Sequence, residues 1–485
     1  MSIKKSLAWL GLAQAISVVL QFASSVVLAR YLTPYEMGIF AVAVATVGML
    51  SLFQQLGLSA LIVREEVLTN EVSSTAFTIN ALITTALSLV IVGASYAGAA
   101  FLGDDGVRQV LLVLAVTPLF GVLSFLPGAN LERHGRFRDI AVISTMSGVI
   151  GAVTTIVLAV LGFKYMSIAY AQVAGSAALA LMLIIAGRQH FSCKVGFMAW
   201  RRVADFGLQM LAVSGIASAS HRLSEIMLGR LLGLASLGLY NRASGLNGLI
   251  WNNIHMVVGR VVLVDFAGLH RQGISLRERY KRTVAIVTAV LWPAFAGLAI
   301  VAEPFIVIVY GERWVPAVVP FVYLAIASMI LVAITMTWEL FTATGRLRTQ
   351  TRIEFIRALV SFALFVGGCL ISLEAAAAAR VLDAIFSVLL YRPHLNRMTN
   401  TTAADFWPIY ARSAVLTALA VAPAAVLMTW GEANGSPTLL AGVIGLGIVL
   451  WSAGLFALKH PLADELKATI GHRFPGVAGR LKLLP

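Results

Sequence analysis

Fourteen apolar runs separated by short polar loops make up most of the chain. An uninterrupted apolar run of about 18 or more residues is long enough to cross a bilayer as a helix. The runs lack the alternation of barrel strands, and only a helix satisfies its own backbone groups in hydrocarbon. We therefore predict an all-α polytopic membrane protein with about 14 transmembrane helices. The runs cover residues 6–29, 35–63, 73–101, 107–131, 138–161, 166–187, 204–232, 236–262, 280–303, 315–343, 350–372, 375–392, 406–430 and 437–458.

Part of this pattern occurs twice, at an offset of about 200 residues. Residues 28–43 (LARYLTPYEMGIFAVA) resemble residues 228–243 (LGRLLGLASLGLYNRA), and residues 135–138 (GRFR) resemble residues 345–348 (GRLR). Internal duplication is a common construction of membrane transporters. Each copy holds six runs, which is an even number, so we expect both copies to have the same orientation. They would then be related by a pseudo-twofold axis along the membrane normal.

The repeat defines the domains that we expect. We predict an N-terminal six-helix lobe at residues 1–190 and a C-terminal six-helix lobe at residues 204–392. Two additional helices follow within residues 406–458, and residues 459–485 form a cytoplasmic tail. The first apolar run is longer than that of a cleavable signal peptide, and it is therefore predicted to be retained.

The net charge of +14 is explained by topology. When the loops are numbered, 25 lysines and arginines fall on one face of the membrane and five on the other. This asymmetry is typical of inner-membrane proteins, whose basic loops are cytoplasmic. We predict that both termini are cytoplasmic and that the basic face contacts anionic membrane lipids, not nucleic acid.

Several chemistries have no signal in the sequence. No Gly-Lys dipeptide occurs, which excludes a P-loop. Cys193 and Cys369 are the only cysteines, and neither a disulfide, a metal site nor another cofactor is expected. Adjacent carboxylates at Asp104 and Asp105 fit an exposed turn, although membrane glycosyltransferases also use acids in such loops.

Ionisable residues inside apolar runs are costly and commonly face a bundle interior or a watery cavity. All the deep ones fall in the second repeat. The arginines, Arg222, Arg242, Arg357 and Arg380, are staggered across the membrane, and their candidate charge partners are Glu225, Glu339, Glu354 and Asp383. Two interpretations stay open. Residues three apart on a helix can simply neutralise one another, or the arginines can line a cavity that binds an anionic headgroup through their planar, permanently charged forks.

Neutral polar residues and the duplicated hairpin each allow two interpretations as well. The neutral residues of the first repeat can hydrogen-bond between helices or contact sugar hydroxyls. The hairpin glycines can permit close packing at a turn or form a paired gate on the outer face. The neutral candidates are Gln14, Gln21, Gln54, Gln55 and Asn80, and the hairpin candidates are Arg30, Pro34, Gly38, Arg230 and Gly238.

The chain resembles the polysaccharide transporter branch of the multidrug/oligosaccharidyl-lipid/polysaccharide exporter superfamily. The resemblance covers about residues 1–400. It rests on the two like-oriented lobes and on four motifs, at residues 30–40 (RYLTPYEMGIF), 55–58 (QLGL), 229–240 (GRLLGLASLGLY) and 310–314 (YGERW).

The resemblance implies a Wzx-type flippase with a cationic cavity between its lobes. Such a flippase moves undecaprenyl-pyrophosphate-linked oligosaccharides to the outer leaflet of the bacterial inner membrane, by alternating access, for capsule, exopolysaccharide or O-antigen synthesis. A polysaccharide polymerase and a chain-length regulator are the protein partners that this implies. The lipid II flippases of the superfamily carry an Arg-Asp pair in the first helix, and its drug exporters depend on acids in the first lobe. Both features are missing here. A cation-coupled drug exporter and, behind it, a polysaccharide polymerase are the alternatives.

Overall fold

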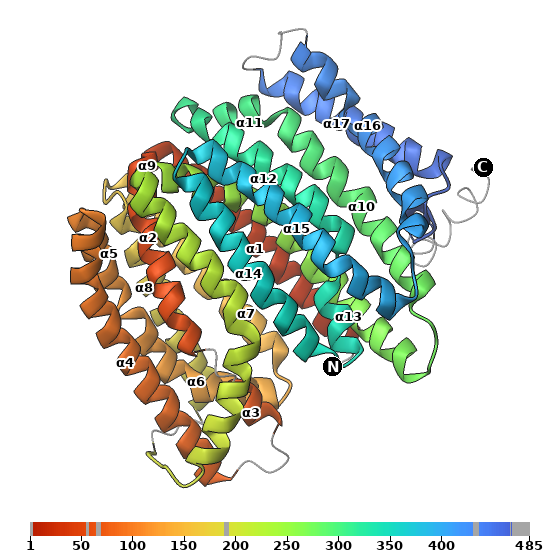
Figure 1. The fold of residues 1–485 in the computed structure, drawn as a ribbon. Helices are drawn as coiled ribbons and strands as arrows, with labels where there is room; N and C mark the ends of the chain where they lie inside the picture. The colour runs from red at the N-terminus through yellow and green to blue at the C-terminus, as the bar shows by residue number, and fades with distance from the viewer. Residues whose placement is uncertain are drawn as a thin grey trace. The chain divides into compact units, whose positions relative to one another are not determined.

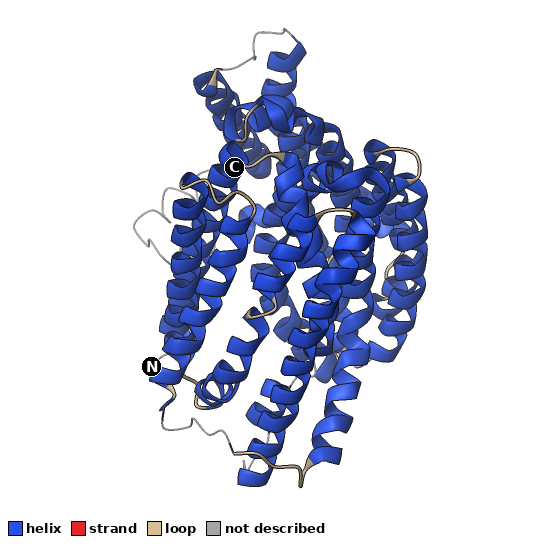
Figure 2. Cartoon of the chain, turned by 90° about the vertical axis from the view of Figure 1, so that its left-hand side faces the viewer, coloured by secondary structure: helices blue, strands red, loops and turns tan. Residues whose placement is uncertain are grey.

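The computed structural model describes residues 3–54, 58–64, 69–188, 194–429, 436–465 and 467. Within these ranges the chain forms helices and turns and no strand (Figure 2). Nine described segments are long and apolar enough to cross a membrane, and two shorter apolar helices precede them. The prediction of an all-α polytopic protein is confirmed, whereas the number of fourteen spans stays a prediction.

The chain divides by its internal contacts into two compact units, Met1–Asn241 and Arg242–Pro485. The lobes expected from the repeat, at residues 1–190 and 204–392, have other boundaries and remain a prediction, as do the additional helices and the tail. Residues 468–485 of that tail lie outside the described residues.

The first unit contains eight α-helices and the beginning of a ninth. The tightly packed pairs are α7 with α8, α1 with α7, and α6 with α8. The elements are α1 (Ile3–Tyr31), α2 (Pro34–Leu50), η1 (Ser51–Gln54), α3 (Leu58–Arg64), α4 (Asn70–Leu102), α5 (Asp105–Leu114), α6 (Thr117–Arg133), α7 (Phe137–Val160), α8 (Met166–Ala186) and the part of α9 (Trp200–Arg271) that precedes Arg242.

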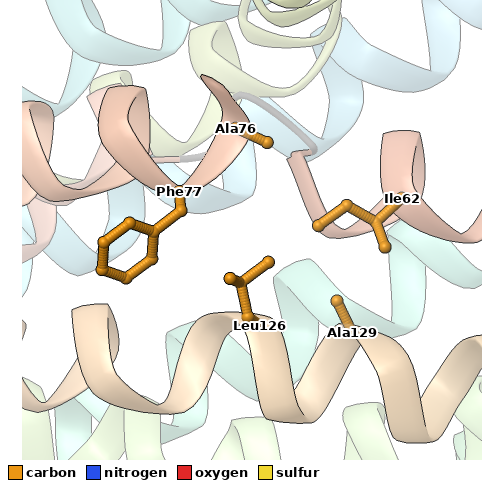
Figure 3. Close-up of a cluster of buried hydrophobic side chains, with 5 residues drawn as sticks. All are labelled: Ile62, Ala76, Phe77, Leu126 and Ala129. Carbon is orange, nitrogen blue, oxygen red and sulfur yellow. The ribbon is translucent and has the colours of Figure 1, made fainter. Parts of the chain in front are cut away.

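Apolar side chains from three helices form one core cluster of this unit (Figure 3). Ile62 comes from α3, Ala76 and Phe77 come from α4, and Leu126 and Ala129 come from α6. The small alanines let the helices approach closely, as is usual where helices pack within a membrane.

The second unit contains the rest of α9 and the helices up to α17, which Figure 1 labels in chain order. Its tightly packed pairs include α14 with α15, α12 with α15, and α10 with α16. The elements are α10 (Arg277–Ile300), α11 (Ala302–Val309), η3 (Glu312–Ala317), α12 (Val318–Leu331), η4 (Val332–Ile334), α13 (Thr337–Ala343), α14 (Leu347–Cys369), α15 (Leu373–Thr399), η5 (Ala403–Phe406), α16 (Trp407–Thr429) and α17 (Pro437–Ala457).

Two helices outside the repeat, α16 and α17, pack on each other, and α16 packs on α10 (Figure 1). The indole Nε1 of Trp451 donates to the carbonyl oxygen of Ala289 at 2.8 Å, and the hydroxyls of Thr288 and Ser413 are 2.8 Å apart. These bonds satisfy polar groups that would otherwise face hydrocarbon.

The turns that the repeat predicted to correspond have the same backbone conformation. Gly135 and Gly345 both have φ of 69°. The next amide closes each turn in the same way, from Arg136 to the Leu131 carbonyl and from Arg346 to the Phe341 carbonyl, at 2.9 Å in both cases. Glycine adopts this left-handed conformation at helix ends without steric cost.

Candidate functional site

The largest group of predicted site residues meets between α14 and α15. We call Glu354, Arg357, Ser361, Arg380 and Asp383 the α14–α15 cluster. The Asp383 Oδ2 atom is 3.7 Å from Arg357 Nη1 and 4.0 Å from Arg380 Nη1. One carboxylate of α15 therefore holds an arginine from each helix, in addition to the pairing within one helix that the spacing suggested.

Ser361 joins the two helices and was missed by the sequence reasoning. Its hydroxyl accepts from Arg380 Nη1 at 3.0 Å and donates to Asp383 Oδ2 at 2.8 Å. The Arg380 guanidinium also lies over the ring of Phe365, 4.1 Å from its centroid. The only sequence signal for Ser361 is its position four residues after Arg357, on the same face of the helix.

Arg357 is held mainly by its own helix. Its Nε atom lies 3.1 Å and 3.0 Å from the two carboxylate oxygens of Glu354, and the Tyr391 hydroxyl donates to Glu354 Oε2 at 2.7 Å. The cluster thus balances two guanidinium groups with two carboxylates. The arginine side chains are not fully buried, being 24% exposed for Arg357 and 14% for Arg380.

Arg222 belongs to the other unit and forms a separate group. Its Nη1 atom is 3.1 Å from Glu225 Oε2, and His221 Nε2 is 3.7 Å from Glu225 Oε1. A Cβ atom at Gly48 of α2 would lie 2.7 Å from Arg222 Nε, so this guanidinium packs directly on the α2 backbone. Arg222 is the most accessible of the four candidate arginines, with 34% of its side chain exposed.

Arg242 packs against aromatic rings, and its assignment to a cargo cavity stays a prediction. It is buried, and its guanidinium lies 4.8 Å from the ring centroids of both Tyr310 and Trp314. Gly311, with φ of 101°, turns the chain between these two rings. The motif at residues 310–314 therefore encloses Arg242.

Glu339 was a candidate charge partner of the arginines, and in the structure it faces a histidine. It lies on α13, and its Oε1 atom is 3.7 Å from Nε2 of His255 on α9. Sequence reasoning missed His255, because nothing in the spacing places it beside Glu339.

The neutral candidates are spread over the first unit. Gln21 is exposed, and Gln54 Nε2 donates to Thr84 Oγ1 at 3.3 Å. Asn80 Nδ2 is buried without a hydrogen bond to another described residue. The side chain of Gln14 and all of Gln55 lie outside the described residues.

The duplicated hairpins touch each other through their glycines. A Cβ atom at Gly38 would lie 1.8 Å from the Leu234 carbonyl oxygen, and one at Gly238 would lie 1.8 Å from the Pro34 carbonyl oxygen. The two backbones can approach this closely only because both positions lack a side chain. Gly233, with φ of 84°, makes the turn that splits α9 in two.

The remaining hairpin candidates are at the ends of these helices. Pro34 begins α2, where Thr33 and Glu36 form a capping box. Arg30 and Arg230 are exposed, and the Arg230 guanidinium lies 5.2 Å from the centroid of the Phe101 ring.

Asp104 and Asp105 have structural roles that account for their presence in the turn. Asp104 caps α5, its Oδ1 accepting from the Gly106 amide at 2.6 Å, and its Oδ2 accepts from the Tyr35 hydroxyl. Asp105 pairs with Arg108 at 3.3 Å. Burial, and then the nearby carboxylates beginning with Asp104, raise the pKa of Tyr165 in the adjacent loop.

No metal site is evident in the described part of the chain, where no three His, Cys, Asp or Glu side chains are grouped to hold an ion. Cys369 is buried, and Cys193 lies outside the described residues.

Comparison with known proteins identifies the family. The model of a family described as polysaccharide biosynthesis protein matches residues 27–319. The chain is similar to the lipopolysaccharide biosynthesis protein WzxC of Escherichia coli, with 24% identity over 63% of each chain. It is also similar to the succinoglycan biosynthesis transport protein ExoT of Rhizobium meliloti, with 25% identity over 64% of this chain and 63% of the relative. The chain therefore spans just under two thirds of each of these relatives.

The fold is also found in a solved structure. The lipid II flippase MurJ, in an inward closed conformation, matches 93% of this chain and 98% of its own with a TM-score of 0.72. At 15% identity this likeness establishes the fold alone. With the family match covering more than half of the residues, the chain belongs to the polysaccharide biosynthesis protein family, in the polysaccharide transporter branch of the multidrug/oligosaccharidyl-lipid/polysaccharide exporter superfamily.

Proposed function

We propose that the protein is a flippase for polyprenyl-pyrophosphate-linked oligosaccharides, and that it works in the bacterial inner membrane with both termini in the cytoplasm. The family match and the likeness to WzxC and ExoT support this function. The observation that carries the mechanism is the α14–α15 cluster. It contains two partly accessible arginines within apolar helices. A charged side chain there is usually paired or belongs to a functional site.

In this mechanism the arginines exchange partners. Arg357 and Arg380 share the carboxylates of the cluster while no cargo is bound, and Arg222 is held by Glu225 in the same way. A pyrophosphate offers oxygens that suit the guanidinium fork, so it can replace a carboxylate as the acceptor. The neutral groups Gln21, Gln54 and Asn80 are our candidates for sugar contacts, with Gln14 and Gln55.

The hairpin contact at Gly38 and Gly238 is our candidate for the outer gate in alternating access. Closing it brings two backbones together at positions that have no side chain. Release of cargo to a polymerase and a chain-length regulator at the outer face would complete the pathway. Arg30 and Arg230, at the same hairpins, would then face the departing anion.

Deletion of the protein from its native strain tests the function. The expected result is loss of surface polysaccharide together with accumulation of lipid-linked repeat units. Normal polysaccharide with increased sensitivity to drugs would instead indicate the drug exporter.

A further inference from the structure

The tenth apolar run, residues 315–343, does not form one continuous helix, although it has no glycine or proline at the interruption. α12 ends at Leu331, a short 3-10 turn follows, and Thr335 is extended with ψ of 156°. Met336 is left-handed, with φ of 59°, before α13 begins. A side chain rarely adopts this conformation, so the break is held by its surroundings.

Three side chains from neighbouring helices satisfy the carbonyl groups that the break frees. Arg392 Nη1 of α15 and the Tyr410 hydroxyl of α16 donate to the Ala333 carbonyl oxygen, at 3.0 Å and 3.3 Å. The Tyr280 hydroxyl of α10 lies 3.5 Å from the Thr335 carbonyl oxygen. The interrupted backbone is therefore supported by protein and is shielded from lipid.

Directly after the break lies a buried acid with an incomplete set of partners. Glu339 is 4% exposed, and only its Oε1 atom faces His255, at 3.7 Å. Its Oε2 atom and Nδ1 of His255 are buried without a hydrogen bond in the described structure. The imidazole is stacked on Trp251 with 5.5 Å between ring centroids, which fixes its orientation.

The space for this pair depends on a glycine. A Cβ atom at Gly259 of α9 would lie 2.5 Å from Glu339 Oε1. Two threonine hydroxyls, Thr335 Oγ1 and Thr342 Oγ1, are also buried and lack a partner among the described residues. Thr342 lies three residues after Glu339 within α13, so these two side chains share a face of the helix, whereas Thr335 lies before the break.

Leaving such atoms unsatisfied is expensive. A buried polar group without a partner costs about 1–3 kcal/mol, so several of them in one place need a physical explanation. A carboxylate, an imidazole and hydroxyls all exchange protons or hydrogen-bond to a protonated acid. The matching position in the first repeat, at an offset of 210 residues, is Ala129, so the acid is specific to the second copy.

We propose that Glu339 and His255 form a proton-binding site at the break in the tenth apolar run, and that its loading and unloading accompany cargo export. This inference rests on the proposed flippase function. The proton adds to the free Oε2 oxygen and turns the carboxylate into a neutral acid, and no other bond changes. Protonation turns an acceptor into a hydrogen-bond donor and removes the buried charge.

The other titratable or charged groups around the break and the site come from four helices. α9 contributes His255, α10 contributes Tyr280, α15 contributes Arg392 and Tyr391, and α16 contributes Tyr410. Arginine and tyrosine side chains ordinarily keep their protons between pH 5 and 8. Arg392 is the one permanent charge among these groups, and it is directed at the Ala333 carbonyl and at the ring of Phe406, 3.8 Å away.

Infrared spectroscopy of the purified full-length protein tests proton binding independently of transport. The C=O stretch of a protonated carboxyl is expected to titrate in the wild type, to disappear in Glu339→Gln and to shift in His255→Asn. The matched control is Glu303→Gln, because Glu303 is an exposed acid of α11 in the same unit. A wild-type spectrum without a carboxyl band that depends on Glu339 would overturn the proposal.

Export measured in spheroplasts tests the coupling. We expect collapse of the pH gradient to slow the appearance of lipid-linked repeat units at the outer face several-fold in the wild type and in Glu303→Gln. Glu339→Gln should be slow with or without the gradient. Wild-type export and gradient dependence in Glu339→Gln would refute the coupling. If the band titrates while the wild type exports no repeat units, the proton site stands and the proposed function fails.

Discussion

Arg380 is the residue on which the α14–α15 cluster most depends, because it contacts Ser361, Asp383 and Phe365 at once. We expect Arg380→Gln to abolish export while the protein still inserts in the membrane. Arg380→Lys keeps the charge but not the planar fork, and it should retain partial export. Surface polysaccharide and membrane-inserted protein are the two readouts.

An exposed arginine provides the control for that prediction. Arg348 is exposed in the first turn of α14 and lies outside the cluster. Arg348→Gln should export like the wild type. Normal export from Arg380→Gln would remove this residue from the cargo site.

Arg242 should behave as part of the scaffold, because two aromatic rings enclose it. A buried cation–π contact is worth up to about 2 kcal/mol, and lysine stacks less well than a guanidinium. We expect Arg242→Lys to lower the free energy of unfolding by about 1–2 kcal/mol. The unfolding temperature in detergent measures this. An unchanged unfolding temperature together with lost export would contradict this role and would support cargo binding by Arg242.

His460, beyond the end of α17, gives a pH dependence of stability. Burial first, and then the charge of Arg412, lower its pKa, while Asp464 acts in the opposite direction. Its Nδ1 atom accepts from the Leu462 amide at 3.2 Å, which requires the neutral ring. The unfolded chain therefore binds more protons in acid, and stability should be lost as the pH falls below about 6.5.

His460→Gln removes this titration. We expect the fall in unfolding temperature between pH 7.5 and pH 5.5 to be smaller in the variant than in the wild type. Equal falls would show that His460 does not carry the effect.

The α1–α2 hairpin and α9 pack backbone against backbone at Gly38 and Gly238. Gly38→Ala or Gly238→Ala would place a methyl group against a carbonyl oxygen, where the backbone must move. Overpacking of this kind costs about 1–3 kcal/mol. Because the contact is our outer gate, we expect both variants to reduce export more than they reduce the amount of inserted protein.

A glycine in open space is the matched control for the hairpin variants. A Cβ atom at Gly245 of α9 would meet nothing within 4 Å, so Gly245→Ala should be close to neutral. Equal effects of all three substitutions would indicate general helix destabilisation and would contradict the gate.

The positions of the helices were predicted from the sequence more completely than the contacts between helices. Continuous apolar runs specify helices in a membrane, since no other local structure satisfies the backbone there. The break at Met336 was missed because the run has no glycine or proline at that point, and the conformation comes from Arg392, Tyr280 and Tyr410 on other helices.

The candidate site shows the same limit at the residue level. The charged pairs within α14 and within α15 follow from helical spacing alone. A single sequence carries no signal for contacts between helices. It therefore could not predict the contacts of Ser361, Tyr391 and His255. Enclosure of Arg242 by residues 310–314 is a further contact of this kind.

At the scale of the whole molecule, the protein is a membrane transporter, and its sequence repeat has diverged in charge. The deep charges belong to the second copy, while the first copy supplies neutral polar groups. Outward movement of an anion is favoured by an inside-negative potential, at about 2.3 kcal/mol per charge per 100 mV. Export of a pyrophosphate-linked cargo therefore needs no hydrolysis of ATP by this chain.

The side of the membrane on which lipid-linked repeat units accumulate distinguishes a flippase from a protein that acts after translocation. In cells that lack the protein, repeat units can be probed with an oxidant that does not cross the inner membrane. We predict that the units are protected in intact spheroplasts and become reactive once the membrane is opened or the wild-type protein is restored. Units that already react in intact spheroplasts of the deletion strain would contradict the flippase and would indicate a step after translocation.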